Sequence, residues 1–480
     1  MSTQSSTTRG QSLALLVIVA GVLITAVDTT IVVLALPEMQ KALHVGLSSV
    51  IWVVIGYLLV ITLLSTQVGK IGDMFGRVRM YETGFLIFVI GSLLCALSWN
   101  EASIIAFRLL QGIGGALVAS NSGAVIADTF PPEKRGRAYG FNAIGWNIGA
   151  VLGVVLGGVI VTYLSWRWIF WINVPIGISA FLLALKVLKE GSERTSRRLD
   201  LPGMVLLGVG LFSLLWGMTR LTSQAFSGTI ALLLLGGVAV LIIFVLVERA
   251  QSEPMLSLEI FKIPTLAPSM IAALLQSLAN FAVLFLLLMY LQGVRQLSPI
   301  SASLLLVPGY VIGGVVGPIG GRLADRIGPV VPATVGLGIQ VIALVIYAQL
   351  TPTSPLLIVV GAYIVGAIGA GSFFPANNSA VMKAAPAESF GIASGVLRTF
   401  ANTGMVFSFA LAMVIASQSI SKTQAFAIFV GSTTLTHSTA ISFTSGIHSA
   451  FYASAGIMLL AAALSAVRSR ANPNRAQVFG

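Results

Sequence analysis

Apolar runs of about 20 residues recur along the whole chain, and they constrain its fold more than any other feature. A run of this length crosses the hydrocarbon core of a bilayer as an α-helix. Charged residues make up only 9% of the chain, against about 25% in soluble domains. They gather in the short stretches between the apolar runs. The sequence therefore predicts an all-α polytopic membrane protein.

Fourteen apolar runs are long enough to cross a bilayer. Their expected first residues are Leu13, Ser49, Thr83, Ala102, Ala138, Trp168, Leu201, Gly228, Leu266, Ile300, Pro329, Pro355, Phe390 and Ser449. An even number of spans leaves both termini on one side, and all but seven of the 27 Lys and Arg residues then fall on that side. Because cytoplasmic loops carry the excess of Lys and Arg, we expect a multi-pass protein of the cell membrane with both termini in the cytoplasm.

Two stretches from the first part of the chain recur further along it. Residues 69–77 (GKIGDMFGR) and 321–329 (GRLADRIGP) share G-x-x-x-D-x-x-G at an offset of 252. Residues 136–149 and 391–404 share three glycines and an asparagine at an offset of 255. Two parallel repeats are typical of transporters, which hold the substrate between the repeats near the bilayer midplane.

The positions of these repeats predict the domain organisation. We expect an N-terminal six-helix bundle at 1–190 and two inserted transmembrane helices with flanking inner loops at 191–262. A C-terminal six-helix bundle follows at 263–480, with an outer hairpin near 417–446 because that stretch is too polar to cross the membrane.

Six stretches resemble the major facilitator superfamily, and most closely its fourteen-helix drug:proton antiporters, the DHA2 family. They are DTTIVVLALP at 28–37, WVVIGYLL at 52–59, GKIGDMFGRVRM at 69–80 (motif A), RLLQGIGGA at 108–116 (motif B), SWRWIFWINVPIG at 165–177 and EPMLSLEIFK at 253–262. The resemblance implies two six-helix bundles that expose one site alternately to the two sides of the membrane. It also implies export of drugs in exchange for protons.

One stretch departs from the family pattern. The antiporter motif C of the fifth helix ends in Gly-Pro-x-x-Gly-Gly, whereas residues 153–158 read GVVLGG, with Val154 in place of the proline. A proline removes a helical hydrogen bond and bends the helix, so Val154 removes that source of bending. The remaining glycines still permit close packing against a neighbouring helix.

A single acidic residue, Asp28, is expected deep within a membrane segment. Arg108 on the fourth span is expected at nearly the same depth, since each residue of a helix advances about 1.5 Å. Pairing lowers the cost of two charges in a membrane. We expect Asp28 and Arg108 to couple proton movement to transport, with Asp28 taking and releasing the proton. The alternative is a purely structural ion pair.

Motif A is expected to form a gate at the inner side. Its residues there are Gly69, Asp73, Gly76 and Arg77, together with Asp128 of the fourth span. Asp73 suits the positive N-terminus of the helix that begins near Phe390, because helix dipoles favour anions there. Arg77 is expected to pair with Asp128. The resemblance implies that these contacts hold the inner side shut; the alternative is that the charges only fix the topology.

Polar and aromatic residues within the spans are candidates for the substrate cavity, because aromatic cavities with few polar groups suit lipophilic ligands and cations. They are Trp52, Tyr57, Asn147, Gln276, Asn280, Phe281, Phe285, Phe373, Asn377, Arg398 and Asn402. Arg398 is expected without a partner, where it would offset negative charge on a substrate or bind backbone carbonyls.

The motifs of common enzymes are missing from the sequence. It contains no phosphate-binding loop, no H-E-x-x-H and no G-x-S-x-G. We therefore expect no enzymatic activity, cofactor or metal. The expected partners are a lipophilic or cationic small molecule, protons and the lipid bilayer, with no nucleic acid, and the protein is expected to be a monomer.

These features predict a proton-driven multidrug exporter. Two alternatives stay open at this point. The first is an exporter or permease for an endogenous metabolite or lipid with atypical or no proton coupling, which Val154 and the scarcity of acidic residues favour. The second is a receptor or sensor built on a transporter scaffold.

Overall fold

The chain is mainly helical in the ranges that the computed structural model describes, which are 2–190, 199–222, 224–251, 254–256, 258–385, 390–416 and 437–467. No β-strand occurs in these ranges. Thirteen of their helices are long and apolar enough to cross a membrane, and a bent pair of helices that passes the same test together raises the number to 14. The predicted fold class is therefore confirmed.

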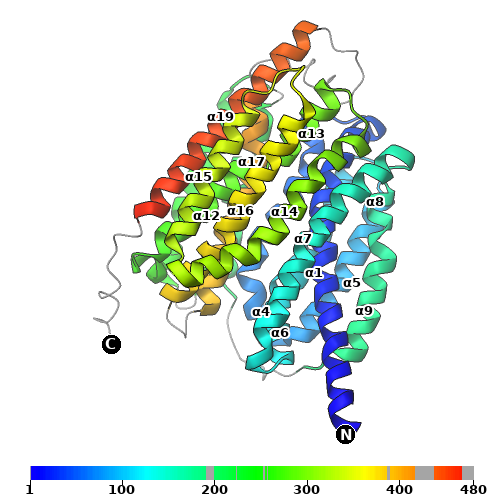
Figure 1. The fold of residues 1–480 in the computed structure, drawn as a ribbon, viewed down its shortest axis with the longest axis vertical. Coiled ribbons are helices and arrows are strands. Elements are labelled where there is room, and N and C mark those ends of the chain that lie inside the picture. Colours follow the sequence, from blue (N-terminus) through cyan, green and yellow to red (C-terminus); the bar gives the residue numbers. More distant parts are fainter. Residues whose placement is uncertain are drawn as a thin grey trace. The chain divides into compact units, whose positions relative to one another are not determined.

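The chain divides into two compact units, Met1–Met204 and Val205–Gly480. The first unit contains the helices α1 (Ser2–Leu43), α2 (Leu47–Val50), α3 (Trp52–Ser65), α4 (Gln67–Phe75), α5 (Arg77–Ala96), α6 (Glu101–Thr129), α7 (Pro132–Tyr163), α8 (Trp168–Trp171) and α9 (Asn173–Val187) (Figure 1). Helices α3 and α4 form the bent pair, with an angle of 61° between them.

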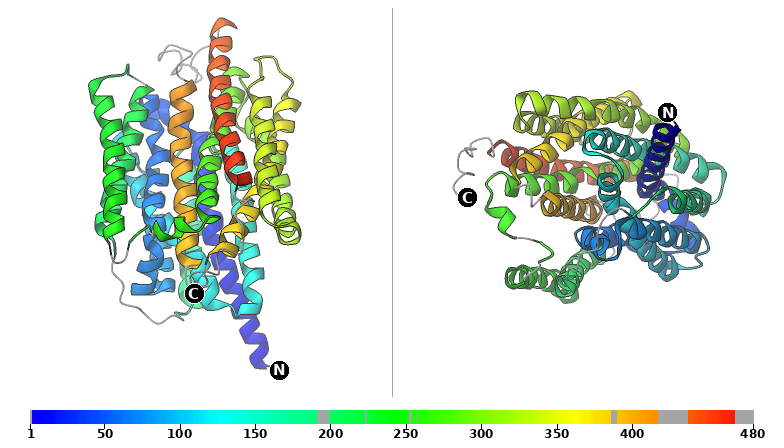
Figure 2. Two further views of the ribbon diagram at one scale, coloured as in Figure 1. Left: turned by 90° about the vertical axis from the view of Figure 1, so that its left-hand side faces the viewer. Right: turned by 90° about the horizontal axis from the view of Figure 1, so that it is seen from below.

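The second unit contains most of α10 (Leu201–Leu221) and the remaining elements, which are α11 (Gly228–Ala250), η1 (Leu258–Lys262), α12 (Leu266–Asn280), α13 (Val283–Leu288), the π-helix η2 (Met289–Val294), α14 (Pro299–Ile327), α15 (Val330–Tyr347), α16 (Leu356–Ala384), α17 (Phe390–Ala416) and α19 (His437–Val467). Figure 2 shows α10 and α11 as a pair of neighbouring green helices. They pack closely because Gly210 of α10 leaves room for Leu241 of α11.

The last membrane helix starts earlier than the sequence predicts. Residues 437–446, expected in an outer hairpin, form the first turns of α19, which begins at His437 and not at Ser449. The apolar run marks only the part of a helix that lies in lipid, so hydropathy does not predict polar turns that extend the helix beyond the membrane. The rest of the expected hairpin, residues 417–436, lies outside the described residues.

A row of glycines lets α7 pack against α1. Gly145, Gly149, Gly153 and Gly157 are spaced four residues apart, and a Cβ atom at any of them would meet α1 at Val19, Leu23, Val27 or Ile31 in turn. At Gly149 that atom would stand 2.6 Å from the backbone oxygen of Leu23. Small residues at such intervals allow two membrane helices to approach closely, so the motif C glycines do pack against a neighbour as predicted. Helix α7 continues without a break through Val154, which is fully buried.

The sequence repeat corresponds to matching helix contacts in the two units. A Cβ atom at Gly114 of α6 would lie 2.7 Å from the carbonyl oxygen of Gly84 in α5. At the repeat-related Gly369 of α16, it would lie 2.5 Å from the carbonyl oxygen of Gly336 in α15. Both units therefore build this helix pair on glycine contacts at equivalent positions.

Two further features repeat. Among the described glycines, Gly76 and Gly328, 252 residues apart, are the two that adopt positive φ angles, of 104° and 88°. Gly404 of α17 faces the backbone of Leu274 in α12, as Gly149 faces Leu23 in the first unit. The internal repeat inferred from sequence is therefore a structural repeat.

Candidate functional site

Four helices of the first unit bring polar side chains to one buried point. Helix α1 carries Asp28, α6 carries Arg108 and Gln111, α5 carries Ser92 and α9 carries Asn173. All five side chains are buried, and Asp28 has no exposed surface. Arg108 and Gln111 are three residues apart, so the helix places them on the same face.

Asp28 receives a hydrogen bond on each carboxylate oxygen. Arg108 Nη1 lies 2.7 Å from Oδ2, which confirms the predicted ion pair. Gln111 Nε2 donates to Oδ1 at 2.9 Å, and Asn173 Nδ2 donates to the same oxygen at 3.1 Å. Ser92 Oγ accepts from both amides, at 2.8 Å and 3.1 Å. These donors match an ionised carboxylate, because an ionised carboxylate can only accept.

The guanidinium of Arg108 is fixed on its other sides. Its Nε donates to the carbonyl oxygen of Val53 at 2.8 Å, and Nη1 also donates to Gln111 Oε1 at 2.7 Å. Its Cζ atom lies 4.2 Å from the centre of the Tyr57 ring and 5.7 Å from that of Phe170. The attraction within a buried pair repays the cost of desolvation only when additional hydrogen bonds are made, and here Val53 and Gln111 accept from Nε and Nη1.

The glycines of motif B allow this network to form. A Cβ atom at Gly112 would stand 3.0 Å from the carbonyl oxygen of Tyr57 in α3. One at Gly114 would collide with the backbone of Phe88 in α5. Helix α6 therefore approaches α3 and α5 closely enough for Arg108 and Gln111 to reach their partners.

The sequence prediction included the two charges but missed three neutral partners. Ser92, Gln111 and Asn173 were not among the candidate residues, although each interrupts an apolar run. These interruptions were a usable signal in the sequence, because a polar side chain buried in a membrane helix needs a hydrogen-bond partner. Hydropathy alone does not identify which of these side chains meet.

At the inner end predicted for the first unit, Arg77 joins two carboxylates. Its Nη1 lies 2.9 Å from Asp128 Oδ1, which confirms the predicted pair. Its Nη2 lies 2.9 Å from Asp73 Oδ1, and Nε donates to the same oxygen. The gating role of these residues, and the contact expected between Asp73 and the helix beginning at Phe390, stay predictions.

Replacing Arg77 with Lys is expected to slow transport several-fold, because one ammonium group cannot reproduce the planar fork that contacts both carboxylates. Replacing it with Gln is expected to be more severe, since Asp73 and Asp128 then face each other without a cation. The rate of dye transport into proteoliposomes measures both effects. Equal rates in the wild type and in Arg77→Gln would leave these charges with a topological role only.

Gly69 and Gly76, the two predicted gate glycines, differ in what they require. Gly76 adopts a positive φ of 104°, where other residues are strained. At Gly69 nothing described lies within 4 Å of where a Cβ atom would stand. Packing therefore does not explain Gly69, whereas backbone conformation is one reason for a glycine at position 76.

The residues predicted to line a substrate cavity lie in different environments. Trp52 and Tyr57 are buried in α3, and Phe373 is buried in α16. Phe281 and Phe285 both contact the ring of Phe409.

Five of the six polar members of the set take part in interactions. Gln276 donates to Gln340 at 2.8 Å, and Asn377 donates to the carbonyl oxygen of Ser269 at 3.1 Å. Asn147, Arg398 and Asn402 also take part in interactions, so the expectation that Arg398 lacks a partner is wrong. Asn280 is half-buried. A cavity-lining role stays a prediction for all eleven residues.

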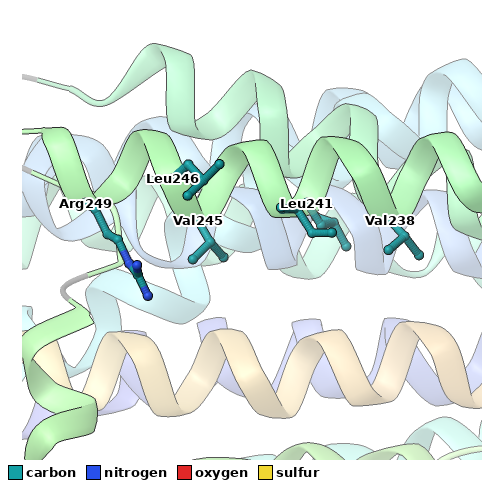
Figure 3. A pocket seen from close by; sticks show the side chains of 6 residues that line it. Val238, Leu241, Val245, Leu246 and Arg249 are labelled. Atoms are coloured by element: carbon teal, nitrogen blue, oxygen red, sulfur yellow. The ribbon is translucent and has the colours of Figure 1, made fainter.

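A groove of about 360 Å³ runs along α11 in the second unit. Its lining residues are Val238, Leu241, Ile242, Val245, Leu246 and Arg249 (Figure 3). Arg249 is the one charged residue among these six, and none of them belongs to the Asp28 network. In the part of the chain that the structure describes, no group of three or more His, Cys, Asp or Glu residues is arranged to hold a metal ion.

Comparison with known proteins identifies relatives over most of the chain. The chain is 30% identical to the riboflavin transporter RibZ of Clostridioides difficile over 418 residues, 86% of this chain and 90% of that protein. It is 31% identical to the multidrug resistance protein Stp of Mycobacterium tuberculosis (strain CDC 1551 / Oshkosh) over 84% of this chain and 75% of that protein. It is 30% identical to the tetracenomycin C resistance and export protein of Streptomyces glaucescens over 81% of this chain and 73% of that protein.

Solved transporter structures share the fold. A bacterial homologue of the human lysosomal transporter Spinster, in an inward-facing and unoccupied conformation, matches 96% of this chain and 97% of its own, with a TM-score of 0.68 and 16% identity. The peptide transporter POT in complex with sulfate matches 95% of both chains, with a TM-score of 0.67 and 15% identity. The sequence profile of the Major Facilitator Superfamily matches residues 18–409. The chain belongs to this superfamily and is a membrane transporter.

Proposed function

We propose that this transporter exports lipophilic or cationic compounds by proton antiport with alternating access. The observation that carries the proposal is the buried pair of Asp28 and Arg108, with each oxygen of Asp28 held by a donor. The names of two relatives, a multidrug resistance protein and a tetracenomycin C resistance and export protein, support export of such compounds.

In the proposed mechanism Asp28 alternates between an ionised and a protonated form. The ionised form keeps the hydrogen bonds from Arg108, Gln111 and Asn173. A proton on Asp28 removes its negative charge, so the attraction to Arg108 falls sharply in a site from which water is excluded. Arg108 and α6 are then free to move, and a cationic substrate competes with the proton for the same carboxylate.

The inner gate would complete the cycle. Arg77 bound between Asp73 and Asp128 would hold the inner side closed while the site faces outward. We place the transporter in the cell membrane with cytoplasmic termini, as the distribution of Lys and Arg favours, and we propose that it acts as a monomer.

A second candidate keeps the fold and changes the cargo. The similarity to the riboflavin transporter RibZ favours an endogenous metabolite as substrate. Val154, inside the unbroken helix α7, favours a transport cycle without the bend that motif C proline provides.

Transport into proteoliposomes separates the two candidates. The probes are ethidium and riboflavin, each offered with and without a pH gradient across the vesicle wall. Drug antiport predicts ethidium movement that requires the gradient and stops when a protonophore is added. Riboflavin movement that persists with the protonophore, without ethidium movement, would reject drug antiport in favour of the second candidate.

A further inference from the structure

The first backbone N–H groups of α5 are capped by a side chain from a distant part of the sequence. The first residues of a helix have no carbonyl partner within it. Here the carboxylate of Glu190 accepts from the N–H of Arg77 at 2.9 Å and of Val78 at 3.4 Å through Oε1. Its Oε2 accepts from the N–H of Arg79 at 3.2 Å. A carboxylate is favourable at this end, where the helix dipole is positive.

Gly76 makes this cap possible. A Cβ atom at Gly76 would lie less than 3 Å from the Glu190 carboxylate, in addition to being strained by the positive φ. The sequence prediction assigned Gly76 to the gate without a reason for its type. The structure supplies two reasons, and one of them is the room that Glu190 occupies.

The second unit lacks the equivalent cap in the described residues. Its repeat-related glycine, Gly328, has a positive φ but nothing within 4 Å of where a Cβ atom would stand. Helix α15 then begins after Pro329, without a side-chain hydrogen bond from this N-cap residue. Among the residues that the structure describes, this side-chain cap is therefore present at the turn of the first unit and not at its repeat.

Glu190 lies between the last membrane helix of the first bundle and the two inserted helices. It follows α9, the sixth membrane span, and comes after Leu188, which is buried. The chain from residue 191 onward leads to α10. The cap thus ties the end of α9 to the turn from which Arg77 reaches Asp73 and Asp128.

We infer that Glu190 is a positioning residue of the inner gate: its carboxylate holds the turn at Gly76 so that Arg77 stays between Asp73 and Asp128. Separation of the end of α9 from α5 removes the cap and loosens this contact. The inference rests on the proposed gating role of motif A but on no particular substrate.

Two measurements on purified protein test the inference without a transported compound. Hydrogen exchange by mass spectrometry follows the amides of residues 77–79. Spin labels on Lys134→Cys and Arg326→Cys, two exposed side chains at the predicted inner ends of the units, report whether the inner side is open. The native Cys95 is buried, so the labels react with the introduced cysteines.

Glu190→Ala is expected to speed exchange at residues 77–79 about fivefold, the factor that corresponds to about 1 kcal/mol of lost capping. It is also expected to shift the label distances towards the inner-open population, and the same shift is expected for Arg77→Gln. Glu190→Gln keeps an acceptor oxygen without the charge and is expected to give intermediate values. Lys189→Ala, at the neighbouring exposed position, is the matched control and should resemble the wild type.

Unchanged exchange in Glu190→Ala would overturn the cap itself. Faster exchange with unchanged label distances would overturn the positioning role while leaving the cap in place. The proposed function fails separately, through a negative result with ethidium in proteoliposomes, because neither measurement here depends on which compound is carried.

Discussion

Replacing Asp28 with Asn is expected to abolish proton-driven transport while the chain still folds. The Asn side chain keeps the size of Asp28 and can still accept from Gln111 or Asn173, but it cannot bind and release a proton at neutral pH. Arg108 then remains buried without an anion, and breaking a buried pair in this way costs about 3–5 kcal/mol. We expect a lower melting temperature in detergent, a single symmetric size-exclusion peak, and ethidium transport equal to that of protein-free vesicles.

Two comparisons distinguish proton coupling from a structural ion pair. Glu38→Gln removes an exposed carboxylate from the same helix, where it pairs with Lys41, and is expected to transport normally. The double variant Asp28→Asn/Arg108→Gln removes both buried charges and is expected to recover stability without recovering transport. Recovery of both together would mean that the pair only stabilises the fold, and the coupling hypothesis would then be wrong.

The membrane spans were predictable because a bilayer leaves a chain few options. Backbone groups in lipid must be bonded within the chain, so each apolar run of sufficient length becomes a helix. The expected starts at Leu201, Gly228, Leu266 and Phe390 coincide with the first residues of α10, α11, α12 and α17. Helix α5 begins at Arg77 and not at Thr83, since a helix can continue past the apolar run that hydropathy detects.

The Asp28–Arg108 contact was predictable for a related reason. Two opposite charges at one depth in a membrane have few ways to lower their cost other than pairing. Neutral partners carry no such constraint, so Gln111 and Asn173 could not be chosen in advance over other polar residues. The role of Glu190 was even harder to predict from the sequence, because its cap depends on how the end of α9 turns towards α5. Substrate choice depends on cavity shape, which a pattern of polar and aromatic residues does not define.

Replacing Gly149 with Ala is expected to disable the transporter through packing alone. The added methyl group would stand 2.6 Å from the carbonyl oxygen of Leu23 and 2.8 Å from the Cβ atom of Ala26. Backbone cannot rotate away as a flexible side chain can, so α1 and α7 must separate. Overpacking of this kind costs about 1–3 kcal/mol. It also moves the helix that carries Asp28, five residues beyond Leu23.

The loss of transport is therefore expected to exceed what the loss of stability alone would cause. The matched control is Gly140→Ala on the same helix, where nothing described lies within 4 Å of the added atom. Gly140→Ala should transport normally, since alanine favours the helix by about 1 kcal/mol over glycine. The two variants are compared by their transport rates and melting temperatures, measured on equal amounts of purified protein. Normal transport in Gly149→Ala would show that the glycine row is dispensable, and that α1 tolerates displacement without losing the contacts around Asp28.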